Sequence, residues 1–455
     1  MSDQSFDIVV LGGGSAGYAV ALRAVQLGKT VAIVEKDKLG GTCLHKGCIP
    51  TKAMLHSAEV ADVVRESGDA GVQAELRGID IERVTAFREG IVAKKFKGLQ
   101  GLISAKGIKV FAGEGRLASP TTVQVGDETL TGTSIVLATG SYPKSLPGLE
   151  ITGNVITSEQ ALQLDWIPQR VAILGGGVIG VEFASVWRSF GVEVTIIEGL
   201  PHLVPNEEES VSKQFERAYK KRGIQFKLGA RFSGVTQDDS GVHVSLENGE
   251  TIDADLLLVA VGRGPVTANL GYEEAGVQLT ESGHIRVNRV ARTSIPSIYA
   301  VGDCSDYLPL ASVASMQGRT AVYHAMGDAV APIEKRNITS NIFTHPEIAT
   351  VGFSQLDVET GVARGTVYKL PLSQNPRAKM QGIKEGFIKL FASRTSGTVI
   401  GGVVVAPRAS ELILPIALAV EHRLTVDQLA SAMSVYPSLS GGITDAARAM
   451  HVRRE

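Results

Sequence analysis

Short apolar runs that lead directly into glycine-rich turns are the clearest pattern along the chain. Residues 7–11 read DIVVL and residues 171–174 read VAIL. Continuous runs of this kind, rich in β-branched residues, are typical of buried strands in parallel sheets. After each turn comes a helical pattern and then a second apolar run, at 30–34 or 193–197. The pattern therefore predicts two copies of a strand–helix–strand unit.

The turns of both copies carry the spacing G-x-G-x-x-G. The glycines are Gly12, Gly14 and Gly17 in the first copy, and Gly175, Gly177 and Gly180 in the second. In each copy an acid, Glu35 or Glu198, ends the second strand at roughly the 20-residue distance that dinucleotide-binding units use for the ribose. The first glycine permits a tight turn, the second lets the backbone approach a pyrophosphate, and the third lets helix and strand pack closely. An ordinary βαβ unit with glycine turns is the alternative, but two complete copies favour two dinucleotide sites.

The remaining segments complete an α/β architecture. Residues 134–140 and 295–303 predict strands that return to the first unit, 256–264 closes the second unit, and Pro143 and Pro147 mark a linker. Residues 338–405 alternate apolar and polar positions, and helices are expected near 409–432 and 441–450. We predict two Rossmann-like dinucleotide-binding domains and an α+β C-terminal dimerisation domain. The expected divisions are 1–148, 149–268, 269–336 (completing the first domain) and 337–455.

Composition excludes several classes of protein. The 455 residues suggest about three domains, and a net charge of −2 favours neither nucleic acid nor an anionic membrane surface as a partner. No apolar run reaches the roughly 20 residues that span a bilayer. The N-terminal residues MSDQSFD lack the features of a signal peptide, and three cysteines do not make a secreted disulfide scaffold. We expect a cytoplasmic protein, in which a disulfide is usually catalytic.

Residues 40–52, GGTCLHKGCIPTK, carry the most informative chemistry. Cys43 and Cys48, on the first turns of a helix, can approach within disulfide distance, and Lys52 follows one turn later. A metal site or two unrelated buried thiols are the alternatives. A zinc site needs about four ligands, however, and no other cysteine or paired histidine stands nearby. The pair therefore favours a disulfide that exchanges electrons with a bound flavin.

The position of the cysteines assigns the two cofactors. The first dinucleotide site lies beside them and is expected to bind FAD, which leaves the second for a nicotinamide nucleotide. Because the carboxylate of Glu198 would repel a 2′-phosphate, we predict NAD rather than NADP. The acid at a strand end, Asp303, is expected to bind the ribityl hydroxyls of FAD.

Taken together, the motifs resemble the flavoprotein disulfide reductases (class I pyridine nucleotide-disulfide oxidoreductases), especially those of the dihydrolipoamide dehydrogenase type. The resemblance covers essentially the whole chain and extends to residues 138–141, 180–182, 259–262, 302–303, 344–347 and 375–379. It implies a homodimer whose active site is completed by the partner's C-terminal domain. It also implies a small dithiol or disulfide substrate, such as a lipoyl group, and allows a place in a multienzyme complex.

The resemblance further implies roles for single residues. Cys48 matches the thiol nearer the flavin and Cys43 the thiol that exchanges with substrate, while Lys52 and Glu182 match an ion pair near the flavin N5. Asp303, Leu310 and Ala311 match a flavin-contacting segment, in which a helix start places positive potential. Further candidate cofactor contacts are Lys36, Gly41, Thr42, Gly115, Thr139, Gly140, Ser141, Ile179, Phe232 and Gly262. No metal is expected.

One segment departs from the family's pattern. The family carries a histidine before a proline and a glutamate five residues later, but Tyr436 and Gly441 occupy these positions here. A histidine suits proton removal from a thiol at neutral pH, whereas a tyrosine is protonated there and is a poor base. Tyr436 is either a donor in the active site or a packing residue. The departure predicts weak dithiol oxidation near neutral pH that recovers as the pH rises.

Tyr436 and the run Gly302-Asp303-Cys304 are similar to mercuric reductase. However, the chain lacks that enzyme's N-terminal cysteine-containing domain, and residues 450–455 carry no cysteine pair. The leading hypothesis is thus an NAD-dependent disulfide oxidoreductase. The alternatives are a reductase of a quinone, a metal ion or another disulfide, and a non-enzymatic relative such as a redox sensor. The intact cysteines and both glycine motifs argue against the last.

Overall fold

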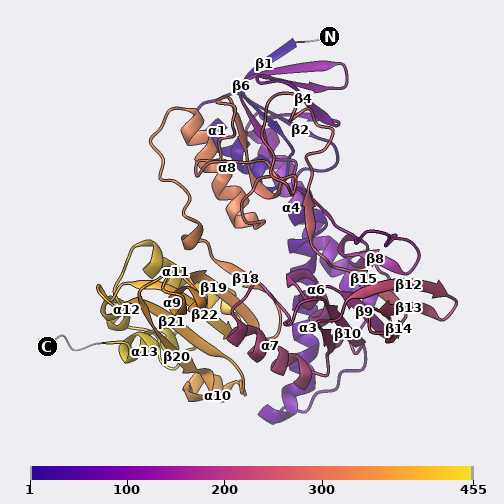
Figure 1. Cartoon of the computed structure of the whole chain (residues 1–455), viewed down its shortest axis with the longest axis vertical. Coiled ribbons are helices and arrows are strands. Elements are labelled where there is room, and N and C mark those ends of the chain that lie inside the picture. Colours follow the sequence, from indigo (N-terminus) through magenta and orange to yellow (C-terminus); the bar gives the residue numbers. More distant parts are fainter. Residues whose placement is uncertain (1–2, 452–455) are drawn as a thin grey trace.

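A computed structural model describes residues 3–451, and its secondary structure falls into three parts (Figure 1). A mixed sheet with helices α1 and α8 occupies the top of the view, a second parallel sheet the lower right, and an antiparallel sheet the lower left. Met1, Ser2 and the C-terminal residues 452–455 considered above lie outside the described residues.

The first sheet has a parallel core in the order β3-β2-β1-β6-β17 and an antiparallel extension, β6-β5-β4. Its strands are β1 (Asp3–Leu11), β2 (Val31–Glu35), β3 (Lys109–Ala112), β4 (Gly115–Ser119), β5 (Thr122–Val125), β6 (Glu128–Leu137) and β17 (Ile298–Ala300). Side chains of β1 alternate between two cores: Ile8 and Val10 pack in the cluster that includes α1 (Ser15–Gln26) and α8 (Ala311–Ala325), whereas Val9 and Leu11 pack on the other face. Burial on both faces explains the continuous apolar run.

The second sheet repeats this plan in the order β11-β10-β9-β15-β8, with every pair parallel. Its strands are β8 (Val155–Thr157), β9 (Arg170–Leu174), β10 (Glu193–Glu198), β11 (Gln225–Leu228) and β15 (Leu256–Val259), and an antiparallel meander joins β12 (Phe232–Asp238), β13 (Gly241–Leu246) and β14 (Thr251–Ala254). The helices of this part are α5 (Ser158–Ala161), α6 (Val178–Ser189) and α7 (Glu209–Lys221). Both predicted units are therefore present.

Residues 256–264, which were expected to close the second unit, contain the end of that sheet and the start of a separate ribbon. β15 ends at Val259, and Arg263–Pro265 forms a separate strand, β16, that pairs with β7 (Ser141–Pro143). These two short strands carry the chain out of the first sheet and back to it, so they form a ribbon between the two units. The long helices α3 (Cys48–Glu66) and α4 (Ile81–Ala105) also connect the units, because α3 packs on both α4 and α6.

The C-terminal part is an antiparallel sheet in the order β18-β19-β22-β21-β20. Its elements are β18 (Ser340–Ile342), β19 (Glu347–Gly352), α9 (Gln355–Glu359), β20 (Gly365–Pro371), α10 (Pro376–Met380), β21 (Phe387–Ser393), β22 (Val399–Ala406), α11 (Ala409–Glu421), α12 (Val426–Ser431) and α13 (Gly441–Ala449). Ile388 and Leu390 of β21 face the core that holds α11–α13. Phe387 and Phe391, on the opposite face, pack with Phe215 of α7 in a core shared with the second unit.

The helix expected over 409–432 is in fact two helices. α11 ends at Glu421, and α12 begins after Thr425, whose hydroxyl accepts a hydrogen bond from the amide of Gln428 while the Gln428 side chain bonds back to Thr425. Such a capping box starts a new helix. Within residues 3–451, no helix is long and apolar enough to cross a bilayer.

Candidate active site

The glycine turns of the two units have nearly the same geometry. A Cβ on Gly12 would lie 2.3 Å from the Ala138 carbonyl oxygen, and one on Gly17 would lie 1.8 Å from the Gly12 oxygen. The corresponding distances in the second unit are 2.5 Å for Gly175 and 2.0 Å for Gly180. The protein's own packing therefore requires glycine at these four positions.

The middle glycines have a different explanation. A Cβ on Gly14 would find no protein atom closer than 3.9 Å, and one on Gly177 none within 4 Å. Both residues start helices, α1 and α6, that have no side-chain cap and no acid in the first turn. The open space in front of uncapped amides fits the pyrophosphate of a dinucleotide, which hydrogen-bonds to such amides.

The two acids also occupy matching positions. Glu35 accepts hydrogen bonds from the amides of Gly13 (2.6 Å) and Asp37 (2.8 Å), and Glu198 accepts them from Gly176 (2.7 Å) and Leu200 (2.8 Å). Each carboxylate oxygen thus uses one of its two lone pairs. One acceptor site per oxygen is left for the two hydroxyls of a ribose, so the residues present fit a dinucleotide in both units.

The cysteines lie directly beside the first glycine turn. The amide of Gly40 donates to the Gly13 oxygen at 2.9 Å, and a Cβ on Gly41 would lie 2.9 Å from the Gly14 Cα. Gly41 begins the short helix α2 (Gly41–His45), so Cys43 and its neighbour Thr42 are held against the first glycine turn.

The two thiols lie on separate helices, which corrects the expectation of one helix. Cys43 belongs to α2 and Cys48 is the first residue of α3. Lys46 and Gly47 separate the two helices. Both are free thiols. A hydrogen bond from Cys43, the charge of Lys52 and a backbone amide lower the pKa of Cys48 to about 7, although burial opposes them. The same hydrogen bond and burial raise the pKa of Cys43 above its usual range, so Cys48 carries the thiolate of the pair.

The predicted ion pair between Lys52 and Glu182 is present. The Lys52 ammonium contacts the two carboxylate oxygens at 2.9 and 2.7 Å, and Glu182, on α6, is only 5% exposed. The Phe343 amide also donates to Glu182 at 3.0 Å, and Lys52 lies 4.6 Å from the centre of the Phe343 ring. Three parts of the fold therefore meet at this pair.

Two contacts at this site were not found from the sequence. Phe343 directly precedes the segment 344–347 that carried the resemblance, but nothing in the pattern points to its amide. Ser15, the first residue of α1, donates a hydrogen bond that lowers the pKa of Cys43. Ser15 lies inside the first glycine motif, and this position is the feature of the sequence that could have indicated its contact with Cys43.

Asp303 and its surroundings lie where β17 ends. The Ser141 hydroxyl donates to Asp303 at 2.7 Å, and the Thr139 hydroxyl donates to the Val266 oxygen at 2.6 Å. Gly140 accepts from the Val266 amide, while Leu310 and Ala311 start α8. These positions lie at the carboxyl ends of parallel strands, where ligands bind in open α/β sheets.

Other predicted cofactor contacts have roles in packing or on the surface. Gly115 is packed so closely that a Cβ would lie 2.4 Å from the Leu11 side chain. Ile179 and Phe232 pack against two apolar cores, and Lys36 pairs with Glu114 at 3.0 Å. Gly262 accepts a hydrogen bond from the amide of Lys144 within the ribbon.

Tyr436 lies far out on the surface of the C-terminal part. Its side chain is 81% exposed, and the neighbouring Met433 and Val435 are also almost fully exposed. Gly441 begins α13 and accepts a hydrogen bond from Thr444. Within the described part of this chain, Tyr436 has no side-chain hydrogen bond that links it to the cysteines.

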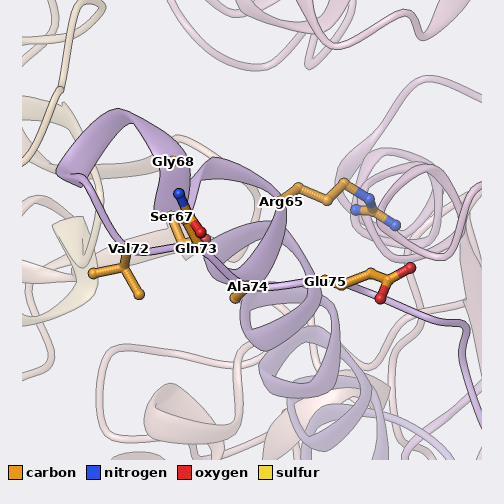
Figure 2. Close-up of a pocket in the computed structure, with 7 residues that line it drawn as sticks. All are labelled: Arg65, Ser67, Gly68, Val72, Gln73, Ala74 and Glu75. Atoms are coloured by element: carbon orange, nitrogen blue, oxygen red, sulfur yellow. The ribbon is translucent and has the colours of Figure 1, made fainter.

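A pocket at the far end of α3 plays no part in this chemistry. Figure 2 shows its lining, which comes from the end of α3 and the loop that follows: Arg65, Ser67, Gly68, Val72, Gln73, Ala74 and Glu75. Arg65 is 17 positions beyond Cys48 in the helix, which places it roughly 25 Å away. The described residues also contain no cluster of side chains suited to a metal ion.

Two family models match the chain. Residues 6–318 match the pyridine nucleotide-disulphide oxidoreductase family, and residues 338–447 match its dimerisation domain. The chain therefore belongs to the pyridine nucleotide-disulphide oxidoreductases, and it is an oxidoreductase with FAD and NAD(H) as its cofactors. Its fold is the α/β fold of that family.

Similar proteins include enzymes with two different names. The chain is 38% identical to an NAD(P)H dehydrogenase (quinone) of Mycobacterium tuberculosis over 97% of this chain and 93% of the other. It is 37% identical to a dihydrolipoyl dehydrogenase of Bacillus subtilis over 98% of both. The crystal structure of LpdA from M. tuberculosis matches with a TM-score of 0.92 and 37% identity, over 99% of this chain and 100% of that one.

Proposed function

We propose that the chain transfers electrons between NAD(H) and a small dithiol or disulfide, such as a lipoyl group, through FAD and the Cys43–Cys48 pair. The observation that carries this proposal is the thiol pair itself. It is held against the first phosphate-binding turn, and its hydrogen bond and Lys52 favour a thiolate on Cys48. A thiolate is the reactive form of cysteine, and a pKa near 7 keeps it populated at neutral pH.

The first unit would hold FAD at Gly12, Gly14, Gly17 and Glu35, and the second would hold NAD at Gly175, Gly177, Gly180 and Glu198. FAD, when bound, supplies a carrier that takes a hydride from the nicotinamide and passes two electrons to a disulfide. The chain's own contribution is electrostatic. Lys52 places a positive charge beside Cys48, and Glu182 fixes the position of Lys52.

In the direction of disulfide reduction, Cys43 transfers its proton to Cys48 and attacks one sulfur of the substrate. A Cys43–substrate bond forms, the substrate S–S bond breaks, and the leaving sulfur takes the proton that Cys48 had received. Cys48, again a thiolate, then attacks Cys43, which closes the Cys43–Cys48 disulfide and releases the second substrate sulfur. Two electrons and one proton thus pass from the cysteine pair to the substrate, and the second proton comes from outside the pair.

We infer that a second copy of the chain completes this site. The exposed apolar segment around Tyr436 belongs to the family's dimerisation domain, and burial of Met433 and Val435 against another copy would remove them from water. Tyr436 of one copy would then face the thiols of the other as a proton donor to the leaving sulfur. A reducing compartment such as the cytoplasm suits an enzyme that works through free thiols.

A second candidate function is the reduction of another acceptor, such as a quinone. Tyr436 and Gly441 favour it, because they replace the histidine and glutamate that would take up the proton in dithiol oxidation. The relative named NAD(P)H dehydrogenase (quinone) gives it further support. A quinone takes electrons without thiol exchange, so it does not need Cys43.

The experiment measures turnover of the purified enzyme with dihydrolipoamide and NAD⁺ from pH 6 to 9, with lipoamide and NADH, and with a quinone and NADH. We expect dithiol oxidation to be weak at pH 7 and to rise several-fold by pH 9, as more substrate thiolate forms. A flat profile would contradict the role given to the missing base.

Cys43→Ser separates the two functions. If the chain acts on disulfides, this variant loses lipoamide reduction and retains reduction of its flavin by NADH. If the quinone is the true acceptor, quinone turnover persists in the variant while lipoamide turnover is negligible even in the unaltered enzyme.

A further inference from the structure

The ribbon between the two nucleotide units contains one arginine that connects them. β16 pairs with β7 in antiparallel register, with Arg263 opposite Pro143 and Pro265 opposite Ser141. The Arg263 side chain is 16% exposed and turns toward the first unit rather than toward water. Neither the glycine motifs nor the cysteine motif includes this residue.

Arg263 and Ser141 are joined by two hydrogen bonds. Arg263 Nε donates to the Ser141 hydroxyl oxygen and Nη2 donates to the Ser141 carbonyl oxygen, both at 2.8 Å. Nη2 also lies 3.5 Å from Glu159, which balances its charge. Because a guanidinium can only donate, the single proton of the Ser141 hydroxyl is free to point elsewhere, and it points to Asp303 Oδ2 at 2.7 Å.

This chain of bonds fixes one carboxylate oxygen and leaves the other open. In the described residues, the Ser141 hydroxyl is the only side-chain or backbone donor to the Asp303 carboxylate. Asp303 also follows a backbone turn held by Gln317, which accepts from the Gly302 amide at 2.8 Å. The Ser141 hydroxyl therefore orients the carboxylate, the backbone before it is fixed by Gln317, and the second carboxylate oxygen keeps acceptor capacity for hydroxyl groups of a ligand.

We propose that Arg263 is a positioning residue for the flavin cofactor. Acting through Ser141, it holds Asp303 so that the free carboxylate oxygen accepts a hydrogen bond from the polyhydroxyl chain of FAD. A residue of the ribbon between the units thus sets cofactor affinity in the first unit. The inference rests on the proposed function, because it needs Asp303 to bind FAD.

The test measures the rate of FAD release from the full-length holoenzyme, followed by the rise in flavin fluorescence at a fixed elevated temperature. Arg263→Met and Ser141→Ala are each expected to speed release about tenfold or more, the effect of losing a charge-assisted hydrogen bond. The double variant should be no faster than the faster single variant, because both changes break the same chain of bonds. Arg263→Lys should restore part of the loss, since an ammonium can donate to one of the two oxygens.

Arg170→Met is the matched control. Arg170 belongs to the same unit and also contacts a carboxylate, Asp255, at 3.2 Å, but it lies away from the ribbon. This variant should release FAD at the unaltered rate. Equal acceleration by Arg170→Met, or fully additive effects of Arg263→Met and Ser141→Ala, would overturn the proposal.

Asp303→Asn distinguishes this failure from that of the proposed function. If Asp303→Asn does not speed release, Asp303 does not hold FAD and the assigned site itself is wrong. If Asp303→Asn speeds release and Arg263→Met does not, only the role of Arg263 is wrong.

Discussion

The two nucleotide units have the same order of strand, glycine turn, helix and strand up to the segments that follow Glu35 and Glu198. After Glu35 the chain returns to the glycine turn, where the Gly40 amide donates to the Gly13 oxygen at 2.9 Å. After Glu198 it returns in the same way, with the Val204 amide donating to the Gly176 oxygen at 2.8 Å. From these points the units differ. The first continues into α2 and the cysteines, and the second continues into α7 and the shared core with the C-terminal sheet.

The comparison shows where function is divided between similar parts. The glycine turns and acids can serve a dinucleotide in either unit, so they do not by themselves assign a reaction. The segments after the return differ: one carries the thiol pair beside the first glycine turn, and the other packs against the dimerisation domain.

The largest effect is expected for Gly17→Ala and Gly180→Ala. A Cβ would lie 1.8 or 2.0 Å from a backbone oxygen, so each unit must distort, and we expect losses above about 3 kcal/mol in the free energy of unfolding. Gly17→Ala should lose FAD. Gly180→Ala should loosen the C-terminal sheet in addition to the second unit, because the two share a core. Flavin content and hydrogen exchange in β21 measure the difference.

Gly98→Ala provides the control, since Gly98 lies within helix α4 and a Cβ there meets no atom within 4 Å. It should leave both readings unchanged or raise stability slightly. Protection of β21 that is lost equally in the two test variants would remove the distinction between the units.

Lys52→Met removes the contact between the units and has the next largest effect. It leaves the buried Glu182 without its cation, which we expect to cost about 3 kcal/mol in stability, and turnover with lipoamide should fall at least about tenfold. Lys52→Met combined with Glu182→Gln should recover much of the stability but not the turnover. Urea unfolding and steady-state assays give the two values.

Lys46→Met is matched to this change, because Lys46 pairs with Asp37 at 3.0 Å while both side chains are largely exposed. Such surface pairs contribute little, so its stability should change by less than about 1 kcal/mol. A comparable loss in Lys46→Met would mean that burial of Glu182 is not the cause.

Gly14→Ala and Gly177→Ala should affect ligands without affecting the fold. The new methyl groups meet no protein atom closer than 3.9 Å, so thermal stability of the apoprotein should be almost unchanged. Gly14→Ala should weaken FAD binding and Gly177→Ala should raise the KM for NADH, each about tenfold, because the methyl group occupies the space assigned to a pyrophosphate. A large fall in apoprotein stability, or unaltered binding in both variants, would refute the assignment of these spaces.

The smallest effect concerns the pH dependence of Cys48. Since its pKa is lowered to about 7, alkylation of the reduced enzyme by iodoacetamide should rise with a midpoint near pH 7. Because folding lowers this pKa, the thiolate stabilises the fold in full only above the pKa of an ordinary thiol, and the contribution is lost as the pH falls from there through 7. In Lys52→Met the midpoint should move upward, toward that of an ordinary thiol. An unmoved midpoint would show that the hydrogen bond from Cys43 is sufficient alone.

The sequence was most informative where local pattern determines structure. The runs at 7–11 and 171–174, with the glycines after them, predicted both units, because burial on both faces and a tight turn leave few other residue choices. Helix boundaries were less accurate. The break at Thr425 depends on a capping contact of a few residues that a longer apolar pattern conceals.

Contacts between distant segments could not be derived from the pattern. Lys52 and Glu182 are 130 residues apart, and their pairing was expected only through the resemblance to a family. Arg263 lies 122 residues from Ser141, and no local signal connects them. The spacing of the two cysteines did not predict the break at Lys46 and Gly47 that places them on separate helices, α2 and α3.

Lys389, in the middle of β21, limits how far the parts of this protein can be exchanged. Its ammonium contacts Glu208, Ser210 and Gln355, so all its donors are used in a buried position between the sheet and the start of α7. A chimera that takes its dimerisation domain from a relative would bury the Glu208 carboxylate without a cation unless the donor sequence also carries a lysine there. The border that the sequence places near residue 337 therefore does not separate independent modules, and a functional transplant must include α7 with its N-cap, residues 208–221, as well.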